Sequence, residues 1–193
     1  MTKKIGKLFI CLGTICLLCA VGLIVYNSFE EKKSEQYASS LLETLKEKMN
    51  DESDLNGDSE MKLIEIDGYD SIGILSIPSL GLEFPVLTDW SYEKLKKAPC
   101  LYFGSYYDEN FVIAAHNFQS HFGRLKELQE RDLITFQDNN GNIYYYEVIL
   151  IETLTKFATE EMITSGFDLT LYTCTLGGAN RVTVRCNQVA IAK

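Results

Sequence analysis

Hydrophobic residues are distributed in three different ways along this chain of 193 residues. Residues 8–26 form an apolar run without a charge, which is long enough to cross a membrane as a helix. From Tyr37 to Met49 apolar residues recur every fourth position, which predicts an amphipathic helix over residues 34–49. Beyond residue 63, short β-rich runs alternate with Gly, Pro, Asn and Asp, which predicts strands and turns.

The charges around the apolar run predict its direction across a membrane. Three lysines lie in residues 1–7, and the mixed sequence EEKK follows the run at residues 30–33. The positive-inside rule therefore places the short tail in the cytoplasm and the long remainder outside. A cleaved signal peptide is the alternative, but VGLIVYNSF offers bulky residues where a cleavage site needs small ones. We expect an uncleaved single-pass anchor in the cell membrane, with the N-terminus inside and the C-terminus outside.

The same patterns divide the chain into four expected segments. The sequence NDESDLNGDSEMK, residues 50–62, is rich in turn-forming residues and predicts a linker. The remainder is long enough for one ordinary domain with its own core. The expected segments are a cytoplasmic tail (1–7), a transmembrane anchor (8–26), a juxtamembrane helix with linker (27–62) and a single β domain (63–193).

The charge of the outer part limits its partners. All 27 acidic residues and 15 of the 18 basic residues follow the apolar run, which gives that part a formal net charge of −12. Nucleic acid and anionic lipid headgroups are therefore poor partners.

The β-rich part predicts a mainly β fold, an eight-stranded closed or nearly closed barrel with short helices. Helical patterns interrupt it at residues 91–98 and 122–129, and NNGN between two β-rich runs predicts a hairpin. The eight runs are SIGILSI, LEFPVL, CLYFG, FVIAAH, LITFQ, NIYYYEVILIE, LTLYTC and RVTVRCNQV.

Cys174 stands at the end of one of these runs, before the turn TLGGAN. In a hairpin of this length Cys174 and Arg181 are near-opposite neighbours on one side of the sheet. An arginine in that place can stabilise a thiolate or bind an oxyanion. The alternative is a buried cysteine beside a solvated arginine. Cys186 shares a face with Val182 and Val184, which predicts a packing role.

The chain offers two histidines as partners for a thiol nucleophile. His116 ends the apolar run FVIAAH, and His121 lies in the loop that follows; either one is alternatively a solvated loop histidine. The order of histidine before cysteine argues against papain-like hydrolases. Two histidines five positions apart, without a C-x-x-C sequence, match no closed zinc site, so no metal is expected.

The sequence TLYTC followed by Arg181, with AAHN upstream, resembles the sortases, membrane-anchored cysteine transpeptidases of Gram-positive bacteria. The resemblance covers residues 71–189 and implies an eight-stranded β-barrel. It implies that Cys174 cleaves an LPxTG-type sorting signal of a surface protein between Thr and Gly, leaving a thioacyl-enzyme. His116 moves the protons, and Arg181 holds the substrate backbone and the oxyanion. The acyl group then passes to an amine of lipid II, peptidoglycan or a pilin.

The resemblance also bears on cofactors and subclass. It implies no cofactor, although some sortases respond to calcium; Glu160, Glu161 and Asp108 are candidates by residue type only, and a solvated acidic face is the favoured interpretation. The short connection at residues 156–168 counts against class B, the second choice, and the end of the chain at Lys193 disfavours class C. A class D-like or unassigned small sortase fits best, with Ala115 as a minor departure from glycine.

Two other functions remain open from the residues. One is a cysteine peptidase that only hydrolyses, and the other is a non-catalytic, membrane-anchored binding barrel. The sequence also leaves open whether Cys100 pairs with Cys186. Trp90 and the tyrosines at 144–146 either line a groove or, as aromatic residues on strands more often do, serve packing.

Overall fold

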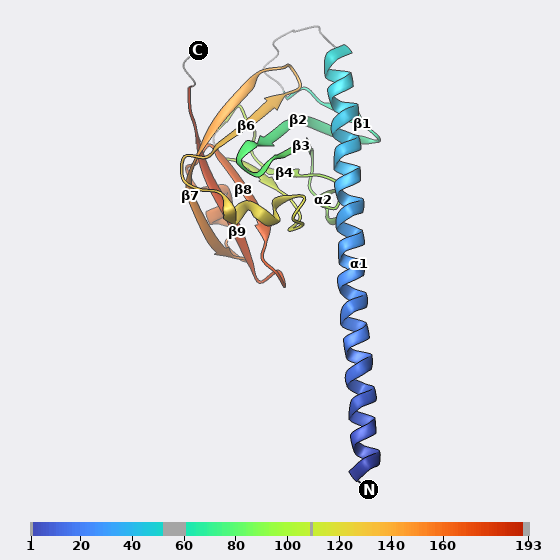
Figure 1. Cartoon of the computed structure of the whole chain (residues 1–193). Coiled ribbons are helices and arrows are strands. Elements are labelled where there is room, and N and C mark those ends of the chain that lie inside the picture. The colour runs from blue at the N-terminus through green and yellow to red at the C-terminus, as the bar shows by residue number, and fades with distance from the viewer. Residues whose placement is uncertain (1, 52–60, 109, 191–193) are drawn as a thin grey trace. The chain divides into compact units, whose positions relative to one another are not determined.

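The computed structural model describes residues 2–51, 61–108 and 110–190 (Figure 1). The chain separates into two compact units, of which the first ends at Lys33 and the second begins at Ser34. Most of the predicted linker, residues 52–60, lies outside the described residues. The four segment boundaries expected from the sequence stay predictions.

One continuous helix, α1 (Thr2–Asp51), runs through the end of the first unit into the second. Its apolar side chains between Ile5 and Phe29 are exposed. Within the described residues, it is the one helix long and apolar enough to cross a membrane. This part of α1 is therefore a candidate membrane anchor.

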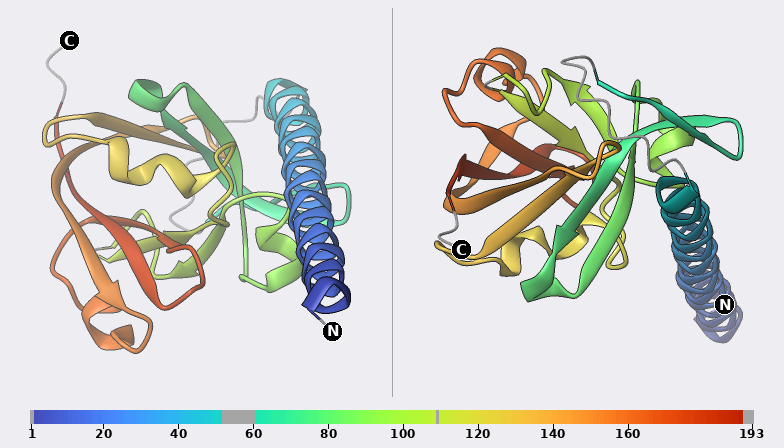
Figure 2. Two further views of the ribbon diagram at one scale, coloured as in Figure 1. Left: turned by 60° about the horizontal axis from the view of Figure 1, so that its bottom comes forward. Right: turned by 90° about the horizontal axis from the view of Figure 1, so that it is seen from above.

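The second unit is built on a closed eight-stranded barrel, which confirms the predicted fold. The barrel strands pair in the order β2-β3-β4-β5-β8-β9-β7-β6, and β2 pairs again with β6 to close the ring (Figure 2). A ninth strand, β1 (Ile64–Ile66), pairs antiparallel with the first residues of β2 and lies outside the ring. The barrel strands are β2 (Tyr69–Ile77), β3 (Leu82–Leu87), β4 (Cys100–Phe103), β5 (Phe111–Ala114), β6 (Leu133–Asp138), β7 (Ile143–Thr155), β8 (Leu169–Cys174) and β9 (Asn180–Gln188).

Closure of the ring depends on one glycine. Gly73 in β2 faces Asp138 of β6 at a φ of +151°, and a Cβ there would lie 2.2 Å from the carbonyl oxygen of Gln137. Only glycine permits so close an approach of the two backbones. The predicted β6–β7 hairpin is confirmed, with Asp138 Oδ1 accepting from the backbone N–H groups of Asn140 and Asn142.

The helical segments are shorter than their patterns predict. The first, α2 (Tyr92–Leu95), is capped by the Ser91 side chain and ends before Pro99 is reached. The second, η2 (Phe122–Glu127), is a 3₁₀ helix, as is η1 (Pro78–Leu80). A further helix, α3 (Thr159–Ile163), joins β7 to β8 and was not predicted.

The last part of α1, from Ser34 to Asp51, belongs to the folded second unit. Leu41 and Leu45 are fully buried in a core beside the barrel, together with Ile64 and Ile66 of β1 and Leu87 of β3. The amphipathic pattern at residues 34–49 therefore marks a face that packs on strands. The barrel interior forms a separate, larger core.

His121 fastens the same part of α1 to the loop after β5. The Ser34 hydroxyl donates to the carbonyl of Lys96 and lies 3.2 Å from His121 Nε2. Because the Ser34 hydroxyl proton is donated to the Lys96 carbonyl, the ring hydrogen of His121 must lie on Nε2, which donates to the Ser34 oxygen. His121 Nδ1 is then a buried atom without a hydrogen-bond partner.

Protonation of His121 is unfavourable in this environment. Burial lowers the pKa of His121 to about 4, with a smaller contribution from the neighbouring His116. The ring is packed edge-on against Phe84 and Phe118, so an added proton on Nδ1 would have no acceptor there. The solvated loop position considered for His121 is therefore wrong.

Replacing Leu45 by alanine is expected to destabilise the second unit by about 2–5 kcal/mol, because it empties a filled core site. Glu47→Ala, an exposed substitution on the same helix, should change the free energy of unfolding by less than about 0.5 kcal/mol. Denaturant titration of the chain in detergent, followed by tyrosine and tryptophan fluorescence, measures both. If Leu45→Ala and Glu47→Ala changed the free energy of unfolding by equally small amounts, the packing of α1 would not contribute to the stability of the fold.

His121 is expected to make stability fall in acid. Its folded pKa lies below the unfolded value of 6.5, so its contribution is complete above pH 6.5 and is lost as the pH falls towards 4. The loss should reach about 3 kcal/mol. His121→Gln, which keeps a donor for Ser34 but does not titrate, should show a smaller decline in melting temperature between pH 7 and pH 4. If the melting temperatures of the wild type and of His121→Gln fell by the same amount, His121 would not be the group responsible for the loss of stability in acid.

Candidate active site

Two strand ends meet through the parallel pairing of β5 with β8. Ala114 pairs with Tyr172, and the next residue, Ala115, donates its backbone N–H to the Tyr172 carbonyl at 3.2 Å. Thr173 Oγ1 in turn donates to the Ala115 carbonyl at 2.9 Å. The same register, continued by two residues beyond Ala114 and Tyr172, brings the position of His116 level with Cys174. Residues distant in sequence thus leave the barrel at the same edge.

The hairpin of β8 and β9 sets Arg181 opposite Cys174. These two residues are direct partners in the ladder, as the six-residue turn between them predicts. Gly177 and Gly178 take positive φ angles in the turn, at 80° and 71°. Arg181 Nη1 donates to the carbonyls of Gly178 and Asn180, both at 3.0 Å. One end of the guanidinium is therefore fixed to the turn beside the thiol.

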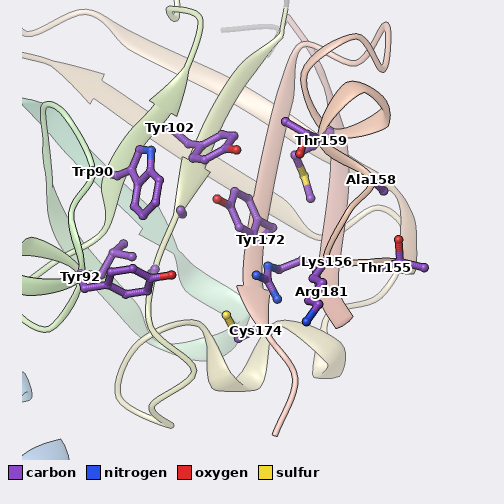
Figure 3. A pocket seen from close by; sticks show the side chains of 14 residues that line it. Trp90, Tyr92, Tyr102, Thr155, Lys156, Ala158, Thr159, Tyr172, Cys174 and Arg181 are labelled. Carbon is purple, nitrogen blue, oxygen red and sulfur yellow. The ribbon is translucent and has the colours of Figure 1, made fainter. Parts of the chain in front are cut away.

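A cavity of about 130 Å³ lies beside this pair (Figure 3). One wall is aromatic: Tyr102 packs against Trp90 at 5.7 Å between ring centroids and against Tyr172 at 5.2 Å. Ala115 forms part of the lining, so the methyl that departs from the sortase pattern faces the cavity. Trp90 is 43% exposed and lines this cavity. Of the two roles that the sequence left open for Trp90, lining a groove is therefore correct and packing in a core is not.

The opposite wall comes from the connection between β7 and β8. Lys156, Ala158, Thr159 and Met162 line the cavity there (Figure 3). The sequence pattern did not identify these residues. Its one usable signal was the short apolar and acidic sequence FATEEMI, too brief for a helical period to be recognised.

Of the cysteines in the second unit, Cys174 is the accessible one among the described residues. Cys100 and Cys186 are fully buried, lie in different cores and are not paired with each other. Burial raises the pKa of Cys100 to about 12 and also raises the pKa of Cys186, so both thiols stay protonated. Cys186 has the packing position predicted for it. Cys174 is partly exposed and lines the cavity.

His116 is held as a neutral base. Its ring stacks on Phe118, with 4.1 Å between centroids and 12° between planes. Burial lowers the pKa of His116, an effect that a hydrogen bond with Asn117 opposes and the charge of Lys96 assists. A neutral imidazole at pH 7 is able to accept a proton from a thiol or an amine.

The acidic candidates for calcium do not converge. Glu160 and Glu161 lie on α3, whereas Asp108 lies in the turn between β4 and β5, where it accepts from Ser105. Within residues 2–51, 61–108 and 110–190, no three or more His, Cys, Asp or Glu side chains form a group suited to a metal ion.

Several solved structures share this fold. Sortase A from Corynebacterium diphtheriae is 21% identical, with a TM-score of 0.58 over 64% of this chain and 63% of that one. Sortase C-3 from Streptococcus pneumoniae is 23% identical, with a TM-score of 0.58 over 82% of this chain and 85% of that one. Sortase C from Clostridium perfringens is 21% identical, with a TM-score of 0.54 over 81% and 91%. This chain thus spans less than two thirds of the corynebacterial enzyme.

No curated protein sequence matches this chain. A family model does match it, and that model describes a sortase domain over residues 75–189. The matched segment is more than half of the chain and contains both strand ends that meet at the cavity. The eight-stranded barrel, found independently of that match, is also the fold of the similar sortase structures. The chain therefore belongs to the sortase family of cysteine transpeptidases.

Proposed function

We propose that this sortase cleaves an LPxTG-type sorting signal between Thr and Gly and transfers the Thr acyl group to an amine. The observation that carries the proposal is the position of Cys174. It is the accessible thiol of the described second unit, it lines the cavity, and it lies opposite Arg181 at a shared strand end.

In the first half of the reaction, the sulfur of Cys174 attacks the Thr carbonyl carbon. The Cys174 thiol gives its proton to His116, a C–S bond forms, the C–N bond to Gly breaks, and the leaving amine takes that proton from His116. Arg181 donates hydrogen bonds to the substrate backbone and to the oxygen that becomes negative in the tetrahedral intermediate. In the second half, an incoming amine attacks the thioester, gives a proton to His116 and releases the thiol.

His116 enters this scheme mainly as the neutral base, since burial lowers its pKa. Formation of the thiolate and imidazolium pair from neutral groups then costs free energy, because burial disfavours the charged imidazole of His116. A slow turnover is consistent with the proposal.

The cavity supports a substrate with apolar residues before the cleaved bond. Trp90, Tyr102 and Tyr172 offer aromatic surface to a leucine and a proline, and Met162 offers an apolar surface opposite. The acceptor amine belongs to lipid II, peptidoglycan or a pilin. One of the similar structures is a pilus island sortase from Group B Streptococcus, 24% identical over 62% of this chain with a TM-score of 0.53, which keeps a pilin among the candidates.

The exposed apolar part of α1 supports a single-pass anchor in the cell membrane of a Gram-positive bacterium, with the catalytic unit outside. Within the family we assign a class D-like or unassigned small sortase. The connection from β7 to β8, residues 156–168, holds one helix of five residues, α3, whereas class B sortases carry a long helical insertion there.

Incubation of the chain with an LPxTG peptide is expected to increase the mass of the protein by that of the peptide up to its Thr. Cys174→Ala should abolish the adduct, because no other accessible thiol lines the cavity among the described residues. Intact mass spectrometry measures both, and Cys19→Ala, which removes an exposed thiol from α1, is the control. Persistence of the adduct in Cys174→Ala would refute the mechanism, and product formation independent of added amine would identify a hydrolase.

Arg181→Lys is expected to slow acyl-enzyme formation about 100-fold or more, because it removes oriented donors for the oxyanion while keeping the charge. Single-turnover mass spectrometry at saturating peptide measures the rate. Iodoacetamide alkylation of Cys174 serves as the control for an intact thiol. An Arg181→Lys rate within threefold of the wild type would show that charge alone suffices and that no oriented donor is needed.

A further inference from the structure

Arg185 is a buried charge that the proposed mechanism does not use. It lies on β9 with its side chain 2% exposed. Its partner in β8 is Thr170, just as Arg181 is the partner of Cys174. Side chains two residues apart on a strand share a face, so Arg181 and Arg185 lie on the same face of this hairpin.

The guanidinium of Arg185 joins β9 to three other elements. Its Nε donates to Glu152 Oε1 of β7 at 2.8 Å, and its Nη1 donates to Thr170 Oγ1 of β8 at 3.0 Å. The other contacts reach α3: Nη1 donates to the Met162 carbonyl at 3.3 Å, and Nη2 donates to the Glu161 carbonyl at 2.8 Å. The charge is thereby paired and hydrogen-bonded, as a buried guanidinium requires.

The helix α3 needs such support because it is marginal on its own. It has five residues, and no side chain caps its N-terminus at Ala158. A helix this short is unstable without tertiary contacts, and the carbonyls of its last turn lack partners within the helix. Arg185 supplies donors and a positive charge to those carbonyls, which is where the helix dipole favours a cation.

Met162 links this contact to the cavity. Its carbonyl accepts from Arg185, and its residue lines the cavity that contains Cys174, together with Ala158 and Thr159 at the start of α3. A shift of α3 would therefore move the part of this wall that Ala158, Thr159 and Met162 form, while the strands that hold Cys174 and Arg181 stay in their ladder. The position of this wall is set from outside the cavity, by a residue that lines no part of it.

We propose that Arg185 is a positioning residue that holds α3 against the barrel and so keeps the cavity in the form that binds the sorting peptide. The proposal rests on the peptide transfer proposed above. It assigns to Arg185 an effect on peptide binding and none on the bond-breaking step, because its guanidinium is committed to the β-strands and to α3. The hydrogen bonds to the carbonyls of α3 contribute more to this effect on peptide binding than the ion pair with Glu152 does, because the Glu152 side chain is 31% exposed.

The test compares four variants of the full chain in detergent. Arg185→Met removes every donor, Arg185→Lys keeps the charge and a donor, and Glu152→Gln keeps an acceptor for Nε. Arg124→Met is the matched control, because Arg124 also donates to a distant carbonyl, that of Leu80, and to a carboxylate, that of Glu127. Acyl-enzyme formation over a range of LPxTG peptide concentrations separates KM from kcat, and hydrogen exchange with mass spectrometry follows residues 158–166.

Arg185→Met is expected to raise KM about tenfold or more, the scale of lost charge-assisted hydrogen bonds, with kcat within threefold of the wild type. Exchange should accelerate in residues 158–166 and stay unchanged in β8 and β9. The KM of Arg185→Lys should lie between those of Arg185→Met and the wild type. The KM values of Glu152→Gln and Arg124→Met should stay within threefold of the wild type.

Two results would overturn the proposal. An unchanged KM with unchanged exchange at residues 158–166 would show that α3 does not depend on Arg185. Faster exchange throughout β7, β8 and β9, with kcat falling alongside, would show a general structural role. A wild-type chain that forms no adduct would instead refute the proposed function, and the exchange comparison would still decide whether Arg185 holds α3.

Discussion

The parallel pairing of β5 with β8 is the contact on which the site depends. It is the step in the barrel that joins the strand leading to His116 with the strand ending at Cys174. No local turn sets these two strand ends side by side, because β6, β7 and α3 lie between the two strands in the sequence. Barrel closure through β2 and β6 completes the ring, so both strand ends are set by a framework without free edges on either side.

The environment differs sharply between groups of the same type within a short distance. Cys100 and Cys186 are kept protonated by burial, while Cys174 lies in a partly open cavity beside a guanidinium. His121 is buried and bonded to Ser34, whereas His116 stacks on Phe118 at the strand end. Placement in the fold, more than residue type, decides which group is available for chemistry.

Local patterns explain what the sequence predicted well. The β-rich runs bounded by Gly, Pro, Asn and Asp identified all eight barrel strands, and the length of the TLGGAN turn placed Arg181 opposite Cys174. Contacts between distant segments left no comparable pattern. The alternation in RVTVRC puts Arg185 on the face opposite Cys186, but nothing in it shows that α3 covers that face. In the same way, the burial of His121 depends on Ser34, which lies far away in the sequence on α1.

The burial of Cys100 and Cys186 also has a consequence for oxidative damage. A thiol oxidised to sulfenic acid is usually rescued by a second, resolving thiol, which forms a disulfide with it. Among the described residues of the second unit, the two remaining cysteines lie in closed cores and are not accessible to Cys174. Repair of an oxidised Cys174 must therefore rely on a thiol from outside the second unit, and in its absence the oxidation would proceed to the irreversible sulfinic acid.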